Sequence, residues 1–401
     1  MKYDFTTILD RKGKDAVAVD GMEKISGFVE EDSEFSGIPM WIADMNFPVV
    51  PKIQETISKR LQHPTFGYFS VREEYYDAIL TWQRERNGVT DLNKEAIGYE
   101  NGVLGGVISA ISAFASAGDA VLLHSPTYIG FTKAITNSGF RIVHSPLKKD
   151  EDHVWRIDYE DMEEKIRTNQ IHVVVFCNPH NPCGRVWEKE ELEKLVEVCK
   201  RNDCVIVVDE IWSDLTLGEH CYLPLESLNE EAKKRTIAFY APSKTFNLSG
   251  LIGSYHVIYD KYLRDRVVSQ SGKCHYNHMN VLSMHALLGA YSKEGMEWLD
   301  ELKAVLGENV DTMCEYLKES VPEVEVYKPQ GTYMLFLECK QWCETYKVSF
   351  EELLRRGWKV GVIWQDGRPF GKEEAVRMNL ALPHSKIEEV VDRLKKYVFV
   401  R

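Results

Sequence analysis

The chain has 401 residues, of which 44% are hydrophobic and 28% are charged, and its formal net charge is −13. This balance is typical of globular proteins, and the length predicts two domains rather than one. The negative charge argues against nucleic acid or an anionic membrane as the main partner. No apolar run reaches membrane-spanning length and the first residues show no signal-peptide pattern, so we expect a cytoplasmic protein.

The nine cysteines are scattered along the chain without paired spacing, which is typical of reduced thiols. Cys339 and Cys343 stand four residues apart, but no second pair of ligands follows them. A metal site is therefore not expected.

The first part of the chain combines an irregular arm with two helices. Residues 1–36 are polar and indicate an adaptable arm, and residues 38–48 are apolar but bracketed by prolines. Helical spacing with proline in the first turn predicts a helix from Pro51 to Gln62. A second amphipathic helix is expected from Val71 to Arg86, ended by Asn87-Gly88.

From Ile97 onward, short apolar strands alternate with helices. Strands are predicted at Val121–His124, Arg141–His144, Val173–Cys177, Val205–Asp209, Ile237–Tyr240 and Tyr255–Ile258. Helices are predicted near 103–117, 127–138, 158–168 and 188–201. Continuous apolar strands joined by helices predict a parallel sheet buried on both faces, with ligands at the carboxyl ends of its strands.

The pattern changes after about residue 290, where a long helix is expected from Gly295 to Ser320. The segments that follow it predict a smaller α+β domain, with strands at Val324–Val326, Thr332–Leu337, Val360–Ile363 and Val376–Leu380 and a helix near 349–356. A last helix is predicted from Ser385 to about Tyr397, with Ser385 as N-cap and Glu388 completing a capping box.

Polar or glycine-rich clusters follow several of these strands. Asn101-Gly-Val-Leu-Gly-Gly106 opens a helix, and a glycine-rich helix N-terminus can bind an anion, although such helix starts are common. Tyr128, in Ser125-Pro-Thr-Tyr128, could stack on a planar ring or pack against its own domain. Asn178-Pro-His-Asn-Pro-Cys-Gly184 predicts a rigid loop that aims the Asn181 amide at a ligand. His180 has no evident partner and is interpreted as a turn residue.

Two charged residues end buried strands. Asp209 closes a wholly apolar strand, where an unpaired carboxylate costs roughly several kcal/mol, so it needs a cation. Lys244 follows the strand Ile237–Tyr240 within Ser243-Lys-Thr. A partly desolvated lysine readily loses its proton and can form an imine with a carbonyl group.

Taken together, these motifs resemble the fold-type I pyridoxal-phosphate enzymes, the class I/II aminotransferase superfamily, from Trp41 to the C-terminal helix. The resemblance implies an α/β protein of PLP-dependent transferase fold type I. Its large domain would hold a mainly parallel seven-stranded sheet beside a smaller α+β domain. The implied boundaries are 1–45 for an N-terminal arm joining the small domain, 46–290 for the large PLP-binding domain and 291–401 for the small C-terminal domain.

The resemblance also assigns roles to residues around pyridoxal 5′-phosphate (PLP). Lys244 would be the catalytic Schiff-base lysine, and Asp209 would pair with the protonated pyridine nitrogen. Asn181 would hydrogen-bond the ring 3′-oxygen and Tyr128 would stack on the ring, and both would also contact the substrate. Trp212 would lie near the same oxygen as an N–H donor, or would face away and only pack.

Binding of phosphate and substrate completes the implied site. Val103, Leu104 and Ser243 would hold the cofactor phosphate, and Tyr68 would reach it from a neighbouring subunit, which implies a homodimer with shared sites. Arg377 would bind the α-carboxylate of an amino acid substrate bidentately. Arg368 is the nearby rival for this role.

Within the superfamily, the chain is most similar to the cystathionine β-lyase or carbon–sulfur lyase subgroup. Met40-Trp-Ile-Ala-Asp-Met-Asn-Phe47 resembles a segment of that subgroup, and Ile252 stands where typical aminotransferases have a phosphate-binding arginine. Trp212, Ile129 and Asn46 depart from the subgroup pattern.

The same residues serve a β-elimination that yields thiol, pyruvate and ammonia, or an amino-group transfer, so the motifs leave both open. A non-catalytic regulator that kept the fold is a third interpretation, which the intact motif residues oppose.

The segment Cys274-His-Tyr-Asn-His278 lies roughly where dicarboxylate transaminases place an arginine from the second subunit. Because no arginine stands between Val267 and Met284, we expect aspartate-like substrates to be poor. His275, Tyr276 and His278 would supply polar contacts to the substrate, or would only cap the helix that follows.

Overall fold

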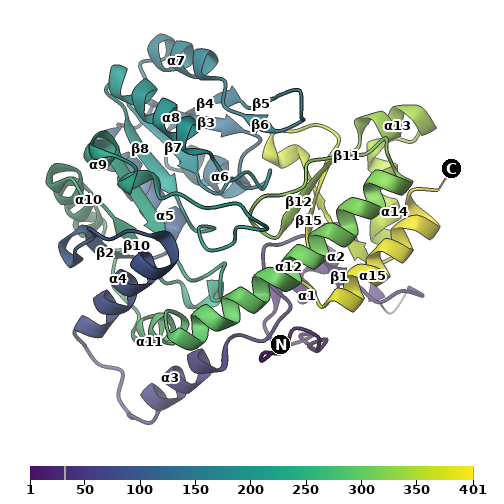
Figure 1. Cartoon of the computed structure of the whole chain (residues 1–401), viewed down its shortest axis with the longest axis horizontal. Helices are drawn as coiled ribbons and strands as arrows, with labels where there is room; N and C mark the ends of the chain where they lie inside the picture. Colours follow the sequence, from purple (N-terminus) through teal and green to yellow (C-terminus); the bar gives the residue numbers. More distant parts are fainter. Residues whose placement is uncertain (31–32, 401) are drawn as a thin grey trace. The chain divides into compact units, whose positions relative to one another are not determined.

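The computed structural model describes residues 1–30 and 33–400. The chain forms two compact units (Figure 1). The smaller unit contains residues 1–48, 182–184 and 300–401, and the larger contains 49–181 and 185–299. We propose that these units are the small and the large domain.

A seven-stranded sheet organises the larger unit, in the order β2-β10-β9-β8-β7-β3-β4. Its strands are β2 (Ile97–Glu100), β3 (Ala120–Ser125), β4 (Arg141–Pro146), β7 (Val173–Cys177), β8 (Val205–Asp209), β9 (Thr236–Tyr240) and β10 (Ser254–Val257). Five of them, from β9 to β4, are parallel neighbours, whereas β10 is antiparallel to both β9 and β2. The predicted mainly parallel seven-stranded sheet is confirmed. Because β10 is antiparallel to both of its neighbours, β2 runs in the same direction as β9.

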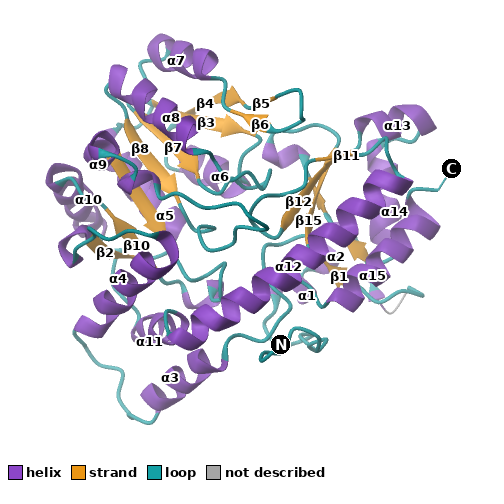
Figure 2. Cartoon of the chain, in the orientation of Figure 1, coloured by secondary structure: helices purple, strands orange, loops and turns teal. Residues whose placement is uncertain are grey.

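Figure 2 shows helices around the strands of this sheet. The helices that lie wholly in the larger unit are α3 (Pro51–Leu61), α4 (Glu73–Asn87), α5 (Val103–Phe114), α6 (Ile129–Asn137), α7 (Tyr159–Thr168), α8 (Lys189–Arg201), α9 (Glu230–Arg235), α10 (Lys261–Cys274) and α11 (Val281–Ala290). A small hairpin pairs β5 (Lys148–Lys149) with β6 (Trp155–Arg156). The side chains of α5 at Val107 and Ile111 pack with Val175, Val207 and Ile237 in one core cluster. Each fully buried side chain of this size contributes roughly 1.5–3 kcal/mol.

The smaller unit is α+β, as predicted. A four-stranded sheet has the order β11-β12-β15-β14, and β1 pairs in parallel with β13. The strands are β1 (Ile38–Pro39), β11 (Glu325–Val326), β12 (Met334–Glu338), β13 (Val362–Ile363), β14 (Gln365–Asp366) and β15 (Ala375–Asn379). The helices are α1 (Val17–Asp20), α2 (Met22–Ser26), α13 (Lys340–Tyr346), α14 (Phe350–Lys359), α15 (His384–Arg393) and the part of α12 (Lys293–Ser320) that begins at Asp300.

One local prediction needs correction. The last helix begins at His384 with Pro383 at its N-cap, so Ser385 lies inside the first turn and does not cap it. Within the predicted arm, α1 and α2 form and bury Ala18 and Met22. None of the helices found in residues 1–30 and 33–400 has the length and hydropathy needed to cross a bilayer.

Candidate active site

The loops that carry the candidate residues leave one edge of the seven-stranded sheet. Strands β2, β3, β7, β8 and β9 share one direction, so their carboxyl ends lie at the same edge. A backbone hydrogen bond of 3.0 Å, from Asn178 N to Asp209 O, joins two of these loops directly. Ligands of parallel sheets bind at such edges.

Asp209 is the last residue of β8 and is only 5% exposed. Its Oδ1 accepts a hydrogen bond of 2.9 Å from Ile211 N. Burial raises the pKa of this carboxyl to about 7, although that hydrogen bond and the charge of Lys244 oppose the rise. The site therefore lacks enough positive charge to keep Asp209 fully ionised, and a protonated ring nitrogen would supply it.

Lys244 lies in the turn that follows β9 and is half-buried. Its Nζ is 5.9 Å from the centroid of the Trp212 ring, which is 2% exposed. The position of the lysine is fixed through its neighbour, because Thr245 Oγ1 donates a hydrogen bond of 2.8 Å to Asp214 Oδ2. The other oxygen of Asp214 accepts a hydrogen bond of 2.9 Å from Trp82 Nε1. Asp214 was not among the predicted site residues, and its signal is a further carboxylate in the buried run that follows Asp209 and Glu210.

The loop 178–184, which carries Asn181, is held by hydrogen bonds of His180 as well as by its prolines. Asn181 is 4% exposed, and the Asn178–Pro179 bond is cis. His180 does have a partner, contrary to the sequence analysis, because its Nε2 lies 2.8 Å from Pro126 O, to which the protonated nitrogen donates. Burial lowers the pKa of His180 to about 4, so this imidazole is neutral near pH 7 and its donor is committed to a carbonyl group.

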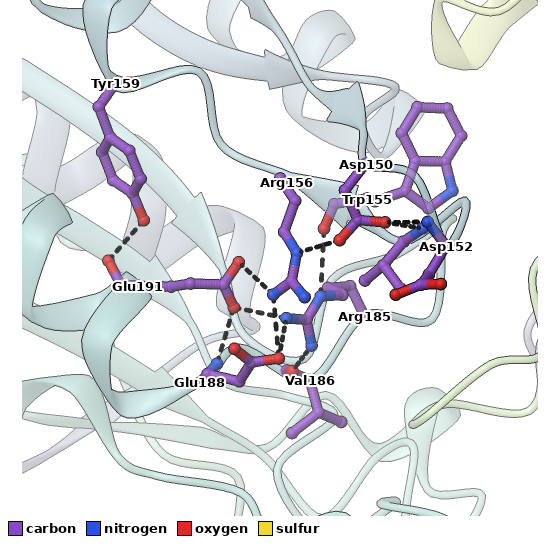
Figure 3. A network of polar contacts seen from close by, with 10 residues as sticks. Asp150, Asp152, Trp155, Arg156, Tyr159, Arg185, Val186, Glu188 and Glu191 are labelled. Atoms are coloured by element: carbon purple, nitrogen blue, oxygen red, sulfur yellow. Dashed lines mark hydrogen bonds and ion pairs between the residues drawn. The ribbon is translucent and has the colours of Figure 1, made fainter.

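A buried ionic network anchors the far end of this loop (Figure 3). Arg185 is fully buried and its main-chain oxygen accepts a hydrogen bond from His180 N. Its guanidinium donates to Trp155 O at 3.1 Å and pairs with Glu188 and Glu191 at the start of α8. Figure 3 shows that both carboxylates are also joined to the guanidinium of Arg156. The network ties the loop to the β5–β6 hairpin and to α8.

The N-terminus of α5 forms the proposed phosphate cradle. Gly102 has φ of +86°, a conformation that glycine adopts without strain. A Cβ on Gly130, the second residue of α6, would lie 2.3 Å from Tyr128 Cε1 and 3.0 Å from Leu104 Cδ1, so the side chains of Tyr128 and Leu104 both lie against the start of α6. Ile252 also adjoins the cradle, because a Cβ on Gly102 would lie 3.6 Å from its Cγ2.

Two further residues were predicted to hold the phosphate. Val103 is the first residue of α5 and is buried, and the half-buried Ser243 directly precedes Lys244.

Tyr68 is fully exposed, at 112% of its reference surface. All ten residues from 61 to 70 are exposed, although three others among them are large and apolar, namely Leu61, Phe66 and Phe69. Such a stretch of apolar surface is typical of an interaction site.

The two candidate arginines of the smaller unit differ in their surroundings. Arg377 is 3% exposed, lies over the Phe370 ring and donates to neutral oxygens, Trp41 O at 3.2 Å and Gln365 Oε1 at 2.6 Å. Arg368 is bonded to the carboxylates of Asp366 and Glu351. Because its charge is already paired, Arg368 is the weaker candidate for a substrate carboxylate.

The segment Cys274–His278 does not cap the helix that follows, because Asn280 is the N-cap of α11. Tyr276 is directed inward instead, and its hydroxyl donates to Glu100. The interpretation of these residues as helix caps is therefore wrong.

Comparison with known proteins places this site in a family. The sequence model of the family "Aminotransferase class I and II" matches residues 42–394. Cystathionine beta-lyase PatB of Bacillus subtilis (strain 168) is 33% identical over 389 residues, which cover 96% of this chain and 97% of that protein. The chain belongs to the aminotransferase class I and II family.

Solved structures agree with this assignment. A PLP-bound protein of Clostridium difficile 630 has a TM-score of 0.90 and 32% identity, with 98% of this chain and 99% of that chain covered. The PLP-bound C–S lyase of Staphylococcus hominis has a TM-score of 0.88 and 28% identity, covering 100% and 99%. Members of the family are PLP-dependent lyases and aminotransferases, so this chain is an enzyme of a PLP-dependent family with fold type I.

The Arg185 network should dominate the stability of the Asn181 loop. We expect Arg185→Met to lower the free energy of unfolding by about 3 kcal/mol, because the buried Glu191 carboxylate loses one of its two guanidinium partners and keeps only Arg156. Arg201→Met is the matched control, since its pair with Glu163 is more exposed and should contribute less than about 1 kcal/mol. Urea denaturation compares the two variants. Equal losses would contradict a special role for Arg185.

Asp209 should make the cofactor-free chain less stable as the pH rises. The folded-state pKa of about 7 lies above the ordinary value of 3.8, so the folded chain binds the proton more tightly. Stability from this group is complete below about pH 4 and is lost as the pH rises through 7. Asp209→Asn removes this loss, so the variant should gain stability over the parent between pH 4 and 7, as measured by urea midpoints. If the urea midpoints of the parent and of Asp209→Asn changed with pH in the same way, a raised pKa of Asp209 in the folded chain would be ruled out.

Proposed function

We propose that this protein is a PLP-dependent carbon–sulfur β-lyase that acts on L-cystathionine or related cysteine S-conjugates. The observation that carries the proposal is the full-length similarity to proteins named as cystathionine and C–S lyases. It is supported by the joint placement of Asp209 and Lys244 at one sheet edge. With L-cystathionine and water, the products would be homocysteine, pyruvate and ammonia.

The residues present fit the cofactor. Asp209 is a buried acid that needs a cation, which the protonated ring nitrogen would provide. The α5 N-terminus offers backbone N–H groups to the phosphate, helped by Ser243. The other proposed contacts are Lys244 as the covalent anchor, Asn181 and Trp212 near the ring 3′-oxygen, Tyr128 on the ring face, Val103 and Leu104 at the phosphate, and Tyr68 from a second subunit.

When bound, PLP supplies an electron sink for negative charge at the substrate Cα. Lys244 Nζ, as a neutral amine, accepts the Cα proton. Arg377 binds the α-carboxylate with two parallel hydrogen bonds and so fixes the orientation of the amino acid. Asp209 keeps its partner nitrogen protonated throughout. The thiolate then departs from Cβ, and hydrolysis of the remaining three-carbon fragment gives pyruvate and ammonia.

Amino-group transfer is the alternative, because the matched family is named for aminotransferases. Both reactions begin with removal of the Cα proton by Lys244. In a transferase, Lys244 would hold and pass on that proton while the amino group stays behind, and a keto acid acceptor would complete the cycle. In a lyase, the leaving group at Cβ departs first and no acceptor is needed.

Incubation with L-cystathionine, with and without a keto acid, separates the two reactions. We expect pyruvate and free thiol to form in equal amounts without an acceptor, and aspartate to be a much poorer substrate by kcat/KM. Lys244→Ala should lose at least about a thousandfold in kcat because the base is removed. Turnover that depends on the keto acid would instead establish an aminotransferase.

We further propose a homodimer with shared active sites. Support comes from the exposed apolar stretch 61–70, which includes Tyr68, since a monomer gains nothing from exposing such residues. A two-fold dimer would bury this surface and place one copy of Tyr68 at each site.

Hybrid dimers of Lys244→Ala with Tyr68→Phe test this arrangement. A hybrid has one site with both native residues, so it should recover about half of the parent activity, whereas each homodimeric variant stays impaired. The heterodimer is isolated with two different affinity tags and its pyruvate formation is measured. No recovery in verified heterodimers would refute a shared site.

A cytoplasmic location is also proposed. None of the nine cysteines, all within the described residues, forms a disulfide. Reduced thiols are typical of the cytoplasm.

A further inference from the structure

A buried polar cluster lies in the larger unit directly beneath the start of α5. Its centre is Glu100, the last residue of β2, which has no exposed surface. Only Asn101 and Gly102 separate it from α5. The proposed function makes no use of this carboxylate, and an uncompensated buried charge is costly.

Both oxygens of Glu100 are bonded to side chains from distant parts of the sequence. His256 Nδ1, on the neighbouring strand β10, lies 2.7 Å from Oε1. The Tyr276 hydroxyl donates to Oε2 at 2.5 Å. Burial and the charge of Glu100 raise the pKa of Tyr276 well above its ordinary value, so the phenol remains a donor at physiological pH. Glu100 is thus held from two sides.

Two glycines make room for these partners. A Cβ on Gly98 would lie 2.3 Å from His256 Cε1, so any larger residue at position 98 would clash with the imidazole ring. A Cβ on Gly105 would lie 2.9 Å from Tyr276 Cε2, so the Tyr276 ring rests on the first turn of α5. The neighbouring residue adds a further tie, because Asn277 Nδ2 donates to Tyr99 O.

We propose that Tyr276 is a positioning residue for the phosphate cradle at the N-terminus of α5. The inference rests on the proposed binding of the cofactor phosphate at Val103 and Leu104. Backbone N–H groups bind an anion well only when they are fixed in place. Tyr276 fixes them by packing on Gly105 and by bonding to Glu100. Its hydroxyl also partly compensates a negative charge that would otherwise repel the phosphate.

This role predicts an effect that is specific for the phosphate group. In Tyr276→Phe, the dissociation constant for PLP should rise about tenfold, because a hydrogen bond to a charged group is lost. The dissociation constant for pyridoxal, which lacks the phosphate, should change less than about twofold. Tyr262→Phe is the matched control, because Tyr262 lies on α10 and is 64% exposed. Fluorescence titration of the cofactor-free protein measures all of these constants.

Equal weakening of PLP and pyridoxal would show that Tyr276 only supports the fold, and unchanged constants would show that it does not act on the cradle. Either result overturns the proposal. If Tyr276→Phe fails to fold, Gly105→Ala serves as the second variant, since its Cβ displaces the Tyr276 ring and the same phosphate-specific loss is expected. Gly272→Ala is its control, because a Cβ there would meet no other atom within 4 Å.

Hydrogen exchange separates this proposal from the one on which it rests. In the parent protein, PLP should protect the amides of residues 103–106, and without cofactor these amides should exchange faster in Tyr276→Phe than in the parent. Absence of protection in the parent would refute the phosphate placement, and the role of Tyr276 with it. Protection that is equal in parent and variant, with equal affinities, would refute only the role of Tyr276.

Discussion

The desolvation of Asp209 is the constraint on which the site depends. β8 is buried between neighbouring strands, so its final carboxylate leaves water and its pKa rises to about 7. One backbone donor and the charge of Lys244 compensate only part of this cost. Burial of this carboxyl lowers the stability of the folded chain near neutral pH, and binding of a cation next to it would restore that stability. Asp209 therefore lacks a full set of partners within the chain, and in the proposed function a positively charged ring nitrogen would supply the missing one.

Three segments at the sheet edge are held by buried charged side chains. Asp214 fixes Thr245, and through it Lys244, while Arg185 closes the Asn181 loop. Glu100 secures the end of β2 beneath the helix start. Buried charges of this kind are expensive unless fully bonded, and once bonded they leave few alternative geometries. Their common effect is to fix the loops before a ligand arrives, so little ordering remains to oppose binding.

The sequence predicted the strands and the charged residues at their ends because both are local signals. A short, wholly apolar run such as β7 is typical of a strand buried on both faces. The carboxylate at the end of β8 stands out because the rest of that strand is apolar. The pattern could not reveal the partner of His180, which lies 54 residues away, or the partners of Glu100. β2 was missed because Gly98 interrupts its short apolar pattern, although the glycine is needed to admit His256. Long-range contacts of this kind leave no periodic trace in the sequence.

The structure also explains why the choice between elimination and transfer cannot be decided by the site residues alone. Under the proposed roles, both reactions would need Lys244 as a base, Asp209 as a counter-charge and a bound α-carboxylate, and they would differ only after the Cα proton has moved. The Trp212 ring, whose centroid lies 5.9 Å from Lys244 Nζ, is the same in either case, so the outcome would depend on how readily the group at Cβ departs. A substrate with a good leaving group at Cβ would therefore favour elimination.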